Sequence, residues 1–132
     1  MTSSEHVFLI DDNVSARHGI ARLLRVACYD VREFGSVDEF LNALGPDTSG
    51  CAILDTGMLG LARERLQAEL ASRNLHLPII VVAADDCSEI RQEAQEMGAA
   101  GFFRKPVDGT ALLDAVEWVL GSKSTGVNDK EP

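Results

Sequence analysis

Three short apolar runs of the sequence end directly in acidic residues: Asp11 and Asp12 after the first run, Asp55 after the second, and Asp85 and Asp86 after the third. Another short run ends in Lys105. If these ends meet, the carboxylates repel, because two unit charges ~5 Å apart cost roughly 3 kcal/mol at an effective dielectric of ~20. A positive charge must therefore lie among them. Mg²⁺ prefers oxygen ligands and suits this set, while Lys105 supplies a second positive charge.

An aspartate in such a pocket can do nucleophilic chemistry on phosphorus and form an aspartyl phosphate. Phosphoryl transfer needs mainly positioning and neutralisation of charge, which a divalent cation and a lysine provide. No GxGxxG or GxxxxGK[ST] motif accompanies the acids, and no Ser–His pairing does, so dinucleotide-binding and P-loop functions lack support. A hydrolase would also need a substrate pocket and a separate general acid–base, which the sequence does not indicate.

Size and composition limit the class of protein further. The chain has 132 residues and a formal net charge of -9, from 21 acidic and 12 basic side chains. The length suits one domain with its own core, and the acidic balance argues against nucleic-acid binding by this domain. The 3 cysteines lack close pairing and are expected to be structural thiols. No signal-peptide pattern and no apolar run near ~20 residues is found, so we expect a cytoplasmic protein without a membrane segment.

The elements that would position the acids alternate between strand and helix. Strands are expected at 7–10, 30–33, 51–54, 79–83 and 101–104, and helices at 15–28, 36–44, 61–73, 86–97 and from 108 onward. Ser36 and Glu39 form a capping box for the second helix. Five strands alternating with five helices predict an α/β fold, a doubly wound parallel sheet with helices on both faces. Parallel strands end at one edge, so Asp11, Asp12 and Asp55 are expected to converge there.

The domain is expected to span residues 1–121. Residues 122–132 are polar and have nothing to bury, so we expect a flexible tail or the start of a linker. No internal repeat is found.

Four segments together resemble the receiver domain of bacterial two-component response regulators, over about residues 5–121. They are FLIDDN, ILDTGM, PIIVVAA and GAAGFFRKP, in this order and at this spacing. The resemblance implies a flavodoxin-like sheet of order 2-1-3-4-5 and a phosphorelay function, with a sensor histidine kinase or phosphotransfer protein as phosphoryl donor. It also implies output through the surface of the fourth helix, fifth strand and fifth helix, to a downstream protein or output domain. A homodimer stays open.

Carried over residue by residue, the resemblance assigns roles to the predicted site. Asp55 would be the phosphoacceptor, and Asp12 and Asp55 would be direct Mg²⁺ ligands. The backbone carbonyl of Gly57 would be a further metal ligand, and Asp11 would act through a metal-bound water. Lys105 would pair with the phosphoryl oxygens. Such a domain catalyses its own phosphorylation and dephosphorylation without being a turnover enzyme.

Two positions concern the switch that the family uses. Phe102 falls where the family keeps an aromatic residue whose rotamer reports activation. The Lys105–Pro106 peptide bond resembles the family's cis peptide and is expected to be cis. Ala83 occupies the family's Thr or Ser position, whose hydroxyl donates to a phosphoryl oxygen. A hydrogen bond to a charged group is worth roughly 1.5–3 kcal/mol, so the active state is expected to be less favoured by up to about a hundredfold.

Two further departures lie after the acceptor strand. Leu59 stands where the family has proline and Arg63 where it has glycine, and both family residues shape the backbone near the metal-binding carbonyl. With Ala83, these departures leave two functions open. One is a phosphoacceptor signalling domain. The other is a degenerate receiver, a protein-interaction module that works without phosphorylation and would tolerate Asp55→Asn.

Overall fold

The computed structural model describes residues 6–46, 48–55, 61–84 and 88–125. Its strands and helices are β1 His6–Ile10, α1 Val14–Val26, β2 Val31–Phe34, α2 Val37–Ala43, β3 Gly50–Asp55, α3 Leu61–Ser72, β4 Ile79–Ala83, α4 Ser88–Glu96, β5 Gly101–Arg104 and α5 Gly109–Thr125. Each expected element is present, with ends shifted by a few residues. The predicted alternation of strand and helix is confirmed.

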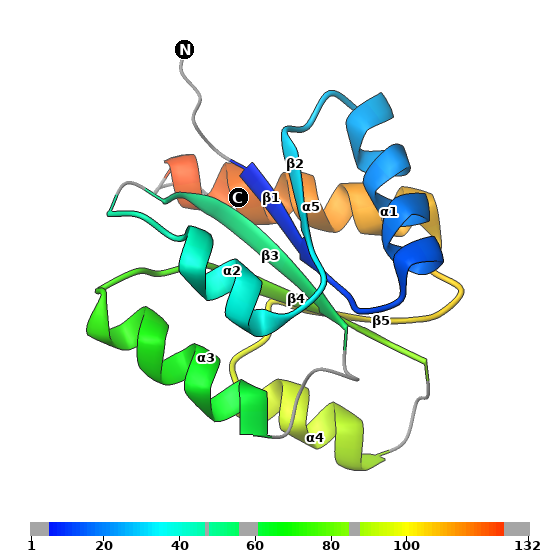
Figure 1. The fold of residues 1–132 in the computed structure, drawn as a ribbon. Helices are drawn as coiled ribbons and strands as arrows, with labels where there is room; N and C mark the ends of the chain where they lie inside the picture. Colours follow the sequence, from blue (N-terminus) through cyan, green and yellow to red (C-terminus); the bar gives the residue numbers. More distant parts are fainter. Residues whose placement is uncertain (1–5, 47, 56–60, 85–87, 126–132) are drawn as a thin grey trace.

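The strands form one parallel sheet in the order β2-β1-β3-β4-β5, with helices on both faces (Figure 1). This confirms the flavodoxin-like arrangement. Ile10 at the end of β1 lies beside Leu54 near the end of β3 in the parallel register. The residues that follow these two positions therefore leave the sheet at the same edge.

Alternating side chains along the strands build two apolar layers. Phe8 and Ile10 of β1 pack in the layer covered by α2, α3 and α4, whereas Val7 and Leu9 pack in the layer covered by α1 and α5. All residues of β4 are buried. A strand buried on both faces gives a continuous apolar run in the sequence, which explains why these strands were recognisable.

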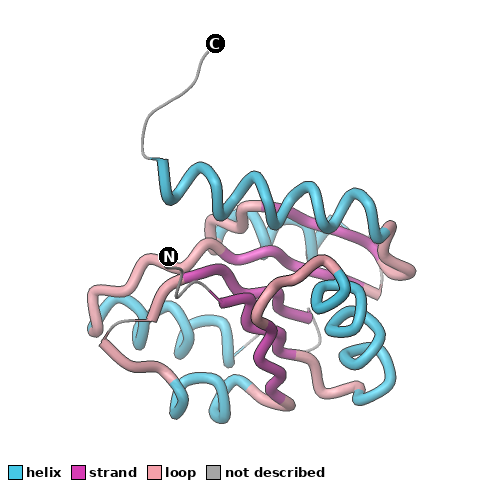
Figure 2. The backbone as a smooth tube through the Cα atoms, turned by 90° about the horizontal axis from the view of Figure 1, so that it is seen from above, coloured by secondary structure: helices cyan, strands magenta, loops and turns pink. Residues whose placement is uncertain are grey.

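The end of the domain differs from the expectation. Helix α5 continues to Thr125, so the boundary expected at residue 121 lies inside this helix, which Figure 2 shows as one continuous rod along one side of the molecule. Val116 and Leu120 are buried and anchor the helix, and adding residues to a formed helix costs little. Residues 122–125 are thus helical and not a tail. Residues 126–132 lie outside the described residues, and for them the tail stays a prediction.

Gly50 at the start of β3 is expected to tolerate no side chain. Its φ is +132°, and a Cβ atom there would lie 1.9 Å from the carbonyl oxygen of His6. Gly50→Ala should lower the free energy of unfolding by about 2 kcal/mol or more, measured by urea denaturation. Gly19→Ala is the control, since no atom beyond its chain neighbours and the adjacent helix backbone lies within 4 Å of its Cβ position, and a helical glycine replaced by alanine should stabilise by about 0.5–1 kcal/mol. Similar effects of the two substitutions would contradict this account.

Candidate functional site

The carboxyl ends of β1 and β3 bring three acidic side chains together. Because Ile10 and Leu54 are register partners, Asp11 and Asp55 follow at the same level on neighbouring strands, and Asp12 is next along the chain. One carboxylate oxygen from each aspartate lies within 4.8 Å of those from the other two. The structure therefore contains the convergence that the sequence predicts.

The three carboxylates differ in their surroundings. Asp11 is the buried one, with 2% of its surface exposed. Its Oδ1 accepts a hydrogen bond from the backbone N–H of Asn13 at 2.9 Å, and its Oδ2 accepts one from Lys105 at 3.2 Å. Asp55 is partly buried and Asp12 is exposed. A buried carboxylate needs such partners, so Asp11 is held in place while Asp12 faces solvent.

Lys105 joins the two less exposed acids. Its Nζ lies 3.2 Å from Oδ2 of Asp11 and 3.1 Å from Oδ1 of Asp55. Burial alone would lower the pKa of Lys105, but hydrogen bonds and charge from Asp55, and then from Asp11, raise this pKa above its ordinary value. The ammonium group is therefore charged at neutral pH. One such charge against three carboxylates leaves the pocket with excess negative charge.

The donor set of this pocket fits a hard divalent cation. All three side chains offer oxygen, and Mg²⁺ takes oxygen ligands. Their mutual separation of up to 4.8 Å is close to the spacing of about 4 Å between opposite ligands of an octahedral Mg²⁺. The expected carbonyl ligand Gly57 lies outside the described residues, as does Leu59. The side chain of Arg63 is not among those that the structure describes.

The ends of β4 and β5 meet next to the acids. Ala83, the last residue of β4, is fully buried, and its carbonyl oxygen accepts a hydrogen bond from the backbone N–H of Lys105 at 2.7 Å. The methyl group of Ala83 offers no donor at this strand end. The Lys105–Pro106 peptide bond is cis, which is the isomer that the resemblance implies.

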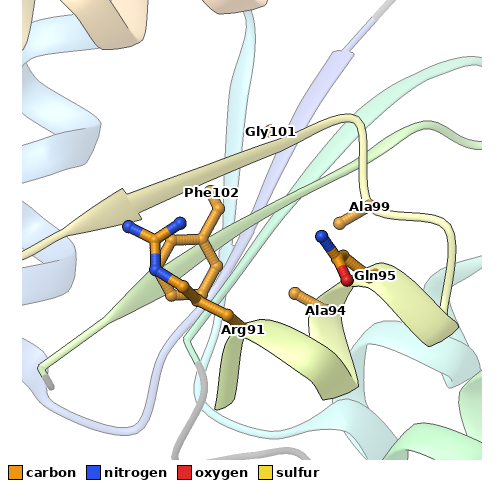
Figure 3. Close-up of a pocket in the computed structure, with 6 residues that line it drawn as sticks. All are labelled: Arg91, Ala94, Gln95, Ala99, Gly101 and Phe102. Carbon is orange, nitrogen blue, oxygen red and sulfur yellow. The ribbon is translucent and has the colours of Figure 1, made fainter. Parts of the chain in front are cut away.

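Phe102 lies on β5, partly buried against the layer beneath α4. The guanidinium of Arg91, an exposed residue of α4, stands over its ring at 4.8 Å from the ring centroid, as Figure 3 shows. A cavity of about 140 Å³ lies beside this pair, lined also by Ala94 and Gln95. Cation–π contacts at exposed sites contribute about 0.5–1 kcal/mol, so Arg91 helps to hold the ring where it is.

Arg17 of α1 contacts the site and was missed by the sequence analysis. Its Nη1 donates to the backbone carbonyl of Asp11 at 2.8 Å, and its Nε donates to Oε1 of Glu33 at 3.1 Å. In the sequence Arg17 is only one of several arginines off the apolar face of a helix. No local pattern distinguishes it, because its partners lie on the preceding strand end and on β2.

With the geometry in hand, comparison with known proteins identifies the family. The fold is that of the flavodoxin-like α/β domains. The family model for the response regulator receiver domain matches residues 7–117. The chain belongs to this family of two-component signalling domains.

Several relatives share this domain. The chain is 38% identical to the transcriptional regulatory protein TdiR of Thauera aromatica over 114 residues, which covers 86% of this chain and 50% of the relative. It is 36% identical to nodulation protein W of Bradyrhizobium diazoefficiens over 110 residues, covering 83% and 48%. The chain thus spans about half the length of these relatives. A response regulator receiver protein from Burkholderia phymatum is similar in structure, with a TM-score of 0.76, 32% identity, and coverage of 89% of this chain and 96% of that one.

None of the described helices has the length and apolar character that crossing a membrane requires.

Removal of the Lys105 charge should show how much the ammonium stabilises the pocket. We expect Lys105→Met to lower the free energy of unfolding at pH 7 in the presence of a chelator. Because the pKa of Lys105 is raised on folding, its contribution is complete below the ordinary lysine pKa of about 10.4 and is lost as the pH rises through the folded-state pKa. The difference between wild type and variant should therefore shrink above about pH 10.4 in urea titrations. A difference that stays constant up to the most alkaline pH tested would contradict the raised pKa.

Proposed function

We propose that this chain is a phosphoacceptor domain, which takes a phosphoryl group onto Asp55 from a phosphohistidine of a sensor kinase or phosphotransfer protein, in a Mg²⁺-dependent reaction. The observation that carries the proposal is the position of Lys105, whose Nζ bridges Asp55 and Asp11 at the edge where three carboxylates gather. A chain built only for protein contact has no need to hold a lysine among these acids.

In the proposed reaction an Oδ of Asp55 attacks the phosphorus of the donor. A new O–P bond forms as the N–P bond breaks, and the electron pair of that bond stays with the donor imidazole. The Asp55 carboxylate loses its own charge on becoming an acyl phosphate, and the departing imidazole nitrogen takes up a proton and leaves as neutral imidazole. The phosphoryl group brings its own negative oxygens to the pocket, and Lys105 then pairs with one of these oxygens.

A bound Mg²⁺ would neutralise charge on the phosphoryl oxygens. The residues that would hold it are Asp12 and Asp55 directly, the carbonyl of Gly57, and Asp11 through a water molecule. Asp11 suits this indirect role because both of its carboxylate oxygens already accept hydrogen bonds.

The output of the domain is proposed to use the surface of α4, β5 and α5, where Phe102 and Arg91 lie. Because the relatives TdiR and nodulation protein W are about twice as long and TdiR is a transcriptional regulatory protein, we infer a downstream output domain or a separate partner protein. The acidic charge of -9 argues that this domain itself does not contact nucleic acid. A cytoplasmic location and a homodimer are part of the same proposal.

The alternative, an interaction module that works without phosphate, is motivated by Ala83. It is less well supported, because the pocket gathers three carboxylates and Lys105 contacts two of them, Asp11 and Asp55. Retention of biological output in Asp55→Asn would favour it.

Phosphorylation of Asp55 should be directly measurable. Incubation with acetyl phosphate and Mg²⁺ should add one phosphoryl group to the wild type by intact mass, because the donor needs no partner protein. Asp55→Asn or addition of a chelator should abolish this mass gain. Asp114→Asn, which changes an exposed aspartate on α5, is the matched control and should be phosphorylated like the wild type. Phosphorylation of Asp55→Asn to the wild-type level would overturn the assignment.

Restoring a hydroxyl at the end of β4 should strengthen the response to phosphate. Ala83→Thr should raise the population of the activated state with a beryllofluoride mimic by up to about a hundredfold, since a hydrogen bond to a charged group contributes roughly 1.5–3 kcal/mol. The resonances of Phe102 report this population by NMR. Ala83→Val is the matched control, because it adds similar volume to the same buried position without a donor. Equal responses of the Thr and Val variants would contradict the proposed hydrogen bond from the hydroxyl to the phosphoryl group.

A further inference from the structure

We propose that Arg17 is a positioning residue for the metal-binding acids: by fixing the peptide group between Asp11 and Asp12, it sets the direction in which Asp12 presents its carboxylate. This role rests on the proposed Mg²⁺ site. It concerns a contact between α1, the end of β1 and β2 that lies beside the pocket and not in it.

The guanidinium of Arg17 is held at two points. Nη1 donates to the carbonyl oxygen of Asp11 at 2.8 Å, and Nε donates to Oε1 of Glu33 at 3.1 Å. Only 15% of the Arg17 side chain and 18% of the Glu33 side chain are exposed. The planar guanidinium carries its donors in a rigid fork, so fixing Nε on Glu33 also fixes where Nη1 points.

The carbonyl of Asp11 matters because it shares one planar peptide group with the N–H of Asp12. The other side of Asp11 is already fixed, since its own N–H donates to the carbonyl of Phe34 at 3.0 Å. With Arg17 on the carbonyl, the peptide plane that leads to Asp12 is fixed as well. Asp12 is exposed, and among the described residues no hydrogen bond or ion pair holds its carboxylate, so the main chain sets the position from which this side chain extends.

Glu33 is a firm anchor for this arrangement. Its carboxylate accepts hydrogen bonds from Arg17 and from Nη1 of Arg25, the latter at 3.0 Å, and Nε2 of His18 lies 3.5 Å away. Burial would raise the pKa of Glu33, but the hydrogen bonds from Arg25 and Arg17 outweigh it and lower this pKa. Glu33 therefore stays ionised at neutral pH and keeps Arg17 oriented.

Arg25 supplies a matched control on the same helix. Like Arg17 it donates to Glu33, and it also donates to a backbone carbonyl, that of Val31 at 3.1 Å. Its carbonyl partner lies at the start of β2, however, and not between the two acids. Substituting either arginine removes an ion pair with Glu33 and a hydrogen bond to a main-chain oxygen. Only substitution of Arg17 releases the peptide group before Asp12.

The test is the affinity of the full chain for Mg²⁺, measured by calorimetry, with the free energy of unfolding measured on the same samples. Groups that orient a metal ligand typically change metal affinity by about tenfold to a hundredfold, and we expect a loss of this size in Arg17→Met. Arg25→Met should bind Mg²⁺ within about twofold of the wild type, because the carbonyl that Arg25 holds, that of Val31, does not lie between the two acids. Both variants are expected to lose some stability, so stability alone does not separate them.

A second readout needs no metal. The amide resonance of Asp12 belongs to the peptide group that Arg17 holds, so it should shift in Arg17→Met and stay in place in Arg25→Met. If Arg17→Met does not fold, Arg17→Lys replaces it. A single ammonium group cannot reach both Glu33 and Asp11 in the same way, and an intermediate loss of affinity is expected.

The outcomes distinguish this role from the proposed function. If the wild type binds Mg²⁺ and a folded Arg17→Met or Arg17→Lys variant binds it equally well, the proposed role of Arg17 is wrong. The metal site itself would then still stand. Equal losses in the Arg17 and Arg25 variants would also overturn it, since they would reflect stability. Failure of the wild type to bind Mg²⁺ would overturn the proposed site, and the role of Arg17 with it.

Discussion

The crowding of three carboxylates at one sheet edge is the constraint on which the rest of this structure depends. The parallel register of β1 and β3 places Asp11 beside Asp55. Oxygens within 4.8 Å of one another repel by roughly 3 kcal/mol for each ionised pair at an effective dielectric of ~20. An apolar sheet packed on both faces keeps the strand ends from separating in response. The pocket therefore has to draw in positive charge, and among the described residues Lys105 brings such a charge into contact with Asp11 and Asp55.

The fold was predictable because its central strands β1, β3 and β4 are buried on both faces. Such strands appear in the sequence as short unbroken apolar runs, as in β4, and acids directly after a run mark where the strand leaves the core. The weakest strand signal was β2, which is partly exposed and begins one residue later than expected. Asp30 lies before this strand, where its carboxylate stands 2.7 Å from Nδ1 of His6. A polar contact of that kind leaves no periodic pattern.

What the sequence could not predict are contacts between distant polar side chains. Arg17 and Arg91 both stand off the apolar faces of their helices, and in the sequence neither differs from an arginine that points only to solvent. Their roles arise from where β2 and β5 lie, since Glu33 and Phe102 are their partners there. The end of α5 was missed for a different reason. Polar residues after Leu120 have nothing to bury, but a helix that is already anchored continues without needing burial at each residue.

If the pocket communicates with the surface of α4, β5 and α5 as proposed, Ala83 supplies no hydroxyl for that step. Among the described contacts, the link between the two strand ends is made by the main chain, where the N–H of Lys105 donates to the carbonyl of Ala83 at 2.7 Å. Lys105 also holds Asp55 and follows Phe102 on the same segment by three residues. A change of charge at Asp55 therefore acts first on Lys105 and on the segment that carries it. Arg91 opposes movement of the Phe102 ring by its contact from α4, so the proposed response of this surface would depend on whether that contact persists when Lys105 pairs with a phosphoryl oxygen.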